Sequence, residues 1–136
     1  MKISNIILWI VKFFVAVILI QTLNFKFSGH PDSVYIFEQT GLGSAGRIGS
    51  GVAELIISIL ILIPGTAWLG ALGAIGTMSG AIFFHLTSLG IEVNDDGGTL
   101  FTMAVIVMLG GFYILFHSRK DIPFPVFRIR DTQAKS

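Results

Sequence analysis

The sequence contains no cysteine and few charged residues. Without thiols the chain cannot form a disulfide, ligate zinc through sulfur or hold an iron–sulfur cluster by itself. Only 12% of the 136 residues are charged, whereas an average soluble domain has about 25%, and this excludes an ordinary soluble monomer. The net charge of +1 supplies no basic surface for nucleic acid. The chain has no intrinsic cofactor chemistry, so a redox role would require a borrowed cofactor or a partner.

Hydrophobic residues are abundant, at 53% of the chain, and the mean hydropathy is +0.82. A bilayer core about 30 Å thick is crossed by about 20 apolar residues in a helix, and the sequence contains four such runs. We therefore predict an all-α integral membrane four-helix bundle in a lipid bilayer. The expected spans cover residues 5–23, 47–63, 66–89 and 99–117.

The connections between the spans differ in character. Residues 24–46 are amphipathic and favour a short helix lying along the membrane interface, followed by a turn at Gly41-Leu42-Gly43. Pro64-Gly65 ends the second span and predicts a tight hairpin with the third. The loop from Gly90 to Gly98 is short, acidic and rich in glycine.

The distribution of positive charge predicts the orientation, because cytoplasmic segments of membrane proteins are enriched in Lys and Arg. Most of the basic residues lie on the side of the termini, and only Lys26 and Arg47 lie on the other side. Both termini are therefore expected in the cytoplasm, with residues 24–46 outside. We expect one membrane domain over residues 1–120 and a polar cytoplasmic tail over residues 121–136.

A stripe of polar and small residues follows the second span. Its members are separated by three or four positions and so share one helix face: Arg47, Ser50, Gly51, Glu54 and Ser58. Polar groups at membrane depth are costly, so this stripe must face protein or water.

Glu54 is the first candidate on this stripe. Burial disfavours an ionised carboxylate unless a cation compensates it, and Arg47 and Lys12 are the candidates for that cation. Two interpretations remain open. Glu54 either anchors a ligand or accepts a proton in an outward-facing cavity, or it clamps neighbouring helices together by hydrogen bonds.

His85 lies near the outer end of the third span, and Asp95 and Asp96 follow in the adjacent loop. An imidazole titrates near neutrality, so His85 is a candidate proton relay or ligand donor, with either aspartate orienting it. The alternative is an interfacial histidine bonded to the loop. Asp96 is also suited to cap the fourth span. No metal site is predicted, because these residues lack a short ligand spacing.

Glycines recur along the third span. Gly76 and Gly80 form a pair of small residues four positions apart, a spacing that permits close approach of two helices. We therefore expect these two glycines to serve packing.

Several short motifs, in this order and spacing, resemble the DoxX family of small four-helix membrane proteins. They are Lys26-Phe27-Ser28-Gly29-His30-Pro31, Gly46-Arg47-Ile48-Gly49, Gly51-Val52-Ala53-Glu54-Leu55, Thr66-Ala67-Trp68-Leu69-Gly70, His85-Leu86-Thr87 and Asp96-Gly97-Gly98. The resemblance implies a multi-pass protein of the bacterial plasma membrane. Some relatives are linked to quinone-dependent sulfur oxidation or to terminal oxidases, as membrane subunits beside a second polypeptide. The family's acidic position in the second span falls on Glu54, and its polar position in the third falls on His85.

Taken together, these patterns lead to two functional hypotheses. In the first, the chain is a membrane subunit that binds a quinone or similar apolar ligand for an oxidoreductase partner. Its ligand-binding residues would be Arg47, Glu54, His85, Asp95 and Asp96. In the second, the chain is a non-catalytic scaffold or assembly factor, and its polar residues only fix helix packing. A homo-oligomer is compatible with either.

Overall fold

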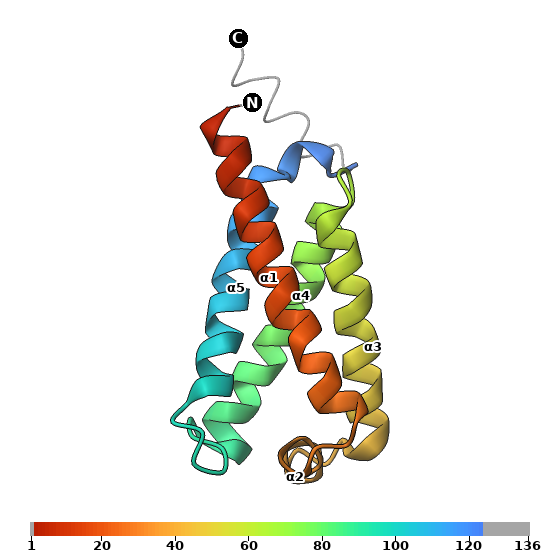
Figure 1. The fold of residues 1–136 in the computed structure, drawn as a ribbon, viewed down its shortest axis with the longest axis vertical. Helices are drawn as coiled ribbons and strands as arrows, with labels where there is room; N and C mark the ends of the chain where they lie inside the picture. The colour runs from red at the N-terminus through yellow and green to blue at the C-terminus, as the bar shows by residue number, and fades with distance from the viewer. Residues whose placement is uncertain (1, 124–136) are drawn as a thin grey trace.

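The computed structural model describes residues 2–123, and within them every regular element is a helix (Figure 1). The helices are α1 (Ile3–Phe27), α2 (Pro31–Gln39), α3 (Gly43–Leu62), α4 (Ala67–Phe84) and α5 (Thr99–His117). A π-helical turn, His85–Leu89, continues α4, and a 3₁₀ turn, Arg119–Asp121, follows α5.

Four of these helices are long and apolar enough to span a membrane: α1, α3, α5 and α4 together with its π turn. They form a closed ring in which α1 and α4 each contact both α3 and α5. The start of α1 and the end of α5 lie at one end of the bundle, and α2 lies at the other (Figure 1). The all-α fold with four spans is confirmed. The cytoplasmic placement of the termini stays a prediction, and residues 124–136 of the expected tail lie outside the described residues.

Two helices extend beyond the apolar runs that predicted them. α1 continues to Phe27 rather than ending near residue 23, and α3 begins at Gly43 rather than at residue 47. The 20 residues of α3 reach about 30 Å at 1.5 Å per residue, enough to cross the hydrocarbon core. The extension of α1 matters most, because it places Lys26 on a helix that packs against α3.

The turn between α3 and α4 forms at Pro64-Gly65, as predicted. Gly65 adopts a φ of +89°, a conformation that suits glycine. The Thr66 hydroxyl donates a hydrogen bond to the Leu60 carbonyl at 2.9 Å and satisfies one of the free carbonyls at the end of α3.

α2 is the short helix expected between the first two spans. Pro31 occupies its first turn, and the His30 side chain accepts a hydrogen bond from the Asp32 amide at 3.2 Å. The Asn94 side chain donates to Asp32 Oδ1 at 2.8 Å and thereby ties α2 to the loop before α5. α2 also packs against α3. These contacts hold it across one end of the bundle.

The glycines of α4 divide into two groups. A Cβ added at Gly70 would lie 2.8 Å from the Ile61 backbone nitrogen, and one at Gly73 would lie 2.8 Å from the Ile57 side chain. These two glycines allow α3 and α4 to approach closely. At Gly76 and Gly80 an added Cβ would meet nothing within 4 Å, so the prediction that this pair packs two helices is wrong.

Alanine substitutions should separate the two groups of glycines. Gly70→Ala forces a methyl group against the α3 backbone and should lower the free energy of unfolding by about 1–3 kcal/mol, the usual cost of overpacking. Gly76→Ala serves as the matched control and should not destabilise the bundle. Thermal unfolding in lipid discs measures both, and equal melting temperatures for the two variants would contradict this packing.

Candidate functional site

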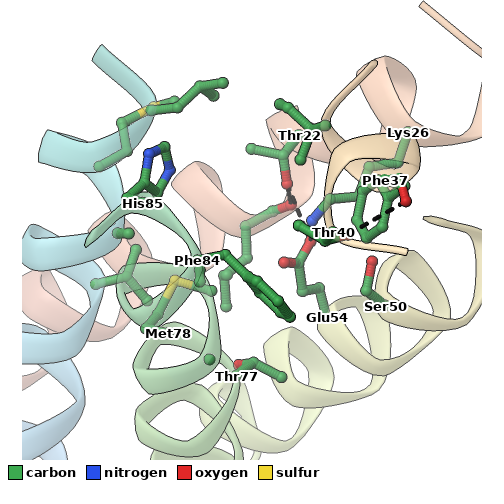
Figure 2. Close-up of a pocket in the computed structure, with 18 of the residues that line it drawn as sticks. Thr22, Lys26, Phe37, Thr40, Ser50, Glu54, Thr77, Met78, Phe84 and His85 are labelled. Atoms are coloured by element: carbon green, nitrogen blue, oxygen red, sulfur yellow. Dashed lines mark hydrogen bonds and ion pairs between the residues drawn. The ribbon is translucent and has the colours of Figure 1, made fainter. Parts of the chain in front are cut away.

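A cavity of about 300 Å³ lies between the helices at the α2 end of the bundle (Figure 2). Residues of α1, α2, α3, α4 and α5 all contribute to its wall, and most of these residues are apolar. The lining includes Ile18, Leu19, Phe25, Ile36, Phe37, Leu42, Met78, Ala81, Phe84, Leu100, Met103, Ala104 and Val107. Gly76 and Gly80 belong to the same wall, which explains the open space around them.

An ion pair forms part of the wall on the α1 and α3 side. Lys26 Nζ donates to Glu54 Oε2 at 2.5 Å, and the two side chains are only 13% and 5% exposed. Thr22 Oγ1 lies 3.2 Å from the same carboxylate oxygen and 2.7 Å from the Leu19 carbonyl. Figure 2 shows Thr22, Lys26 and Glu54 gathered on one side of the cavity. The carboxylate that the sequence singles out is thus paired with a cation from the neighbouring helix.

The cation that compensates Glu54 is neither of the two expected from the sequence. Lys12 lies about 20 Å along α1 from Lys26, and its Nζ lies 4.5 Å from the centroid of the Trp9 ring. Arg47 donates to the Lys26 backbone carbonyl, close to the C-terminal end of α1, and is absent from the cavity lining. Arg47 therefore positions the backbone that carries Lys26, and the expectation that it flanks a ligand beside Glu54 is not supported.

His85 is buried on the opposite side of the cavity, where α4 changes into the π turn (Figure 2). Its Nδ1 lies 2.9 Å from the Gly90 carbonyl oxygen, and its ring packs edge-to-face on Phe101 of α5, with centroids 5.6 Å apart. A π turn within an α-helix is a frequent feature of functional sites. Here it places a histidine in the cavity wall and fixes the ring through the loop that follows.

The two aspartates do not reach the cavity. Asp95 is exposed with a φ of 62°. Asp96 accepts hydrogen bonds from the backbone amides of Val93, Gly98 and Leu100 at 3.0, 2.8 and 3.2 Å. Asp96 therefore satisfies the Leu100 amide in the first turn of α5, from two residues before the N-cap Gly98, in line with the predicted capping role. The Gly90 carbonyl, rather than an aspartate, bonds His85 Nδ1.

Sequence reasoning missed Lys26 and Thr22 as site residues. The signal was their spacing of four positions, which puts them on one face of a helix, but the apolar run of α1 ends before Lys26. Only the observed length of α1 brings both side chains against Glu54.

The polar groups of the cavity wall are suited to hydrogen bonding. Across residues 2–123, no group of three or more His, Asp or Glu side chains lies close enough together to hold a metal ion. The cavity instead offers ionisable groups on two opposite sides of an apolar space, Lys26 with Glu54 and His85 alone. Such a space takes an apolar molecule with polar groups on its edges.

The Asp96 cap should make the loop before α5 sensitive to acid. Burial opposes ionisation of this carboxyl, but hydrogen bonds from Val93, Gly98 and Leu100 and the nearby His85 outweigh it, so the pKa of Asp96 lies below its usual value of 3.8. Because the pKa is lowered in the folded state, the ionised cap stabilises the fold above about pH 4 and less as the pH falls through the folded pKa. Asp96→Ala should cost about 1 kcal/mol at pH 7 and much less at pH 3. Melting temperatures at both pH values measure this, and an equal loss at both would contradict the role of the charge.

Comparison with known proteins places the chain in a family. The DoxX family model matches residues 7–87, which include most of α1, all of α2, α3 and α4, the lysine–glutamate pair and His85. No curated protein and no solved structure matches the chain. Because the match covers more than half of the sequence, the chain belongs to the DoxX family of membrane proteins.

Proposed function

We propose that this protein binds a quinone or a similar small apolar ligand in the cavity and serves an oxidoreductase partner. The observation that carries the proposal is an apolar cavity with ionisable groups on two opposite sides, enclosed by helices long and apolar enough to span a membrane. Ionisable residues inside membrane segments are expensive and commonly mark ligand or proton sites. We further propose that the protein resides in the bacterial plasma membrane with both termini in the cytoplasm, so that the cavity and α2 lie on the outer side.

The residues present fit the head group of such a ligand. A cavity of about 300 Å³ is at the lower end of ligand-pocket volumes and suits one substituted ring rather than a ring with its whole tail. Phe84 and Met78 offer apolar contacts to a ring face. Gly76 and Gly80 are exposed at the edge of the cavity, where an apolar tail would pass into the lipid.

Each polar residue has a separate task in this proposal. A bound quinone would supply two-electron redox chemistry, which the side chains of this protein lack. Lys26 and Glu54 bind and orient one edge of the ring, and His85 binds the other. The apolar lining excludes water. We propose that the electrons are exchanged with a partner protein.

A scaffold role is the second candidate, and one observation favours it. Lys26 donates to Glu54 Oε2 at 2.5 Å, so the pair joins α1 to α3 without any ligand. A scaffold of this kind needs Glu54 for stability but retains no small molecule.

Ligand retention distinguishes the two roles. We expect mass spectrometry of small molecules that copurify in native lipid discs to find a quinone-type ligand with the wild type. Gly76→Leu should reduce its amount at least about tenfold, because the new side chain occupies the cavity and costs the ligand apolar contacts worth more than about 1.4 kcal/mol. Glu54→Gln should also reduce it, through the loss of a charged hydrogen-bond partner.

Gly49→Leu is the matched control, because a Cβ at Gly49 meets nothing within 4 Å and Gly49 is absent from the cavity lining. It should retain the ligand as the wild type does. If folded wild type carries no ligand and Glu54→Gln only lowers the melting temperature, the ligand-binding proposal fails and the scaffold role stands.

A further inference from the structure

The hydrogen bond of His85 determines which kind of ligand group this side of the cavity accepts. A carbonyl oxygen can only accept a hydrogen bond, so the contact between His85 Nδ1 and the Gly90 carbonyl at 2.9 Å requires a hydrogen on Nδ1. In a neutral imidazole the other nitrogen, Nε2, then carries a lone pair and acts as an acceptor.

Nε2 is the ring nitrogen available to a ligand. Gly90 is absent from the cavity lining, so the Nδ1 edge of the ring is committed to the loop. Among the described residues, one buried side-chain polar atom has neither accessible surface nor a hydrogen-bond partner, and it is the Ser33 hydroxyl oxygen. Any other side-chain nitrogen or oxygen of a buried residue that lacks a partner is therefore accessible. His85 Nε2 has no hydrogen-bond partner within these residues and is therefore accessible. His85 is only 6% exposed and lines the cavity, so we take Nε2 to face it.

The same argument applies to Glu54 on the opposite side. Both hydrogen bonds to its carboxylate reach Oε2, from Lys26 and from Thr22. Oε1 accepts none from the described residues and is not an inaccessible atom. Since Glu54 is buried and lines the cavity, Oε1 is a second acceptor available to a ligand. Lys26 adds N–H donors, but only on this side.

We infer that the cavity selects a ligand that carries hydroxyl groups on two opposite edges, such as an aromatic diol, over the corresponding dicarbonyl. The inference rests on the proposed function and specifies its ligand. A hydroxyl donates to His85 Nε2 on one side and to Glu54 Oε1 on the other. A carbonyl has no hydrogen, so on the His85 side its oxygen faces a lone pair and loses its hydrogen bond to water. In quinone terms, the hydroquinone form binds more tightly than the quinone form.

The test compares three tail-less probes of one ring size: a substituted benzoquinone, its hydroquinone, and the dimethyl ether of that hydroquinone, which keeps both oxygens but has no hydroxyl hydrogen. Dissociation constants are measured without oxygen in lipid discs, with empty discs as the reference for partition into lipid. We expect the wild type to bind the hydroquinone at least about tenfold more tightly than either other probe, because a polar group left without its hydrogen bond costs about 1–3 kcal/mol.

Substitution of His85 checks the origin of the preference. His85→Phe keeps an aromatic ring against Phe101 but removes the acceptor, so the preference for hydroquinone should fall severalfold. His117→Phe, outside the cavity, is the matched control and should keep it. If His85→Phe does not fold, the three probes on the wild type decide alone. Equal or tighter binding of the quinone overturns this inference and leaves the proposed function intact, whereas absence of binding by all three probes overturns both.

Discussion

The ion pair between Lys26 and Glu54 is the interaction on which the rest of the structure depends. A single charge at the centre of a membrane helix costs about 2.5–3.5 kcal/mol on insertion scales, so Glu54, in the middle of α3, is not tolerated facing lipid. At 2.5 Å, each provides the partner that the other requires. The pair joins the last turn of α1 to α3. Arg47 supports it by bonding the backbone of Lys26.

The cavity follows from this constraint together with the composition of α4. Gly70 and Gly73 bring α4 against α3 at the end of the bundle remote from α2. Farther along α4, Gly76 and Gly80 provide no side chains, so the space between the helices is left open there. The π turn then places His85 across this space from the ion pair. α4 therefore packs closely against α3 near its first turns and leaves a cavity beside its later turns.

Features that depend on local sequence could be predicted, and features that depend on contacts between segments could not. The four spans and the Pro64-Gly65 turn follow from apolar length and backbone preference, which are local properties. Glu54 and His85 stand out because polar groups are costly in a membrane.

Lys26 was missed because only the packing of α1 on α3 reveals it as a partner. Asp96 was expected either to orient His85 or to cap α5. Its carboxylate accepts hydrogen bonds from backbone amides instead of contacting His85. The spacing of Gly76 and Gly80 shows that they share a face, but not what that face meets.

The most direct test of the ion pair is a double-mutant cycle with Lys26→Met, Glu54→Gln and the double variant, with the free energy of unfolding measured in mixed lipid and detergent micelles. Removing one partner of a buried pair costs about 3–5 kcal/mol because the other is left uncompensated. The ion-pair account predicts that each single variant loses stability on this scale and that the double variant loses clearly less than the sum of the two. Strictly additive losses would show that the two side chains act independently, and would contradict a bundle organised by their pairing.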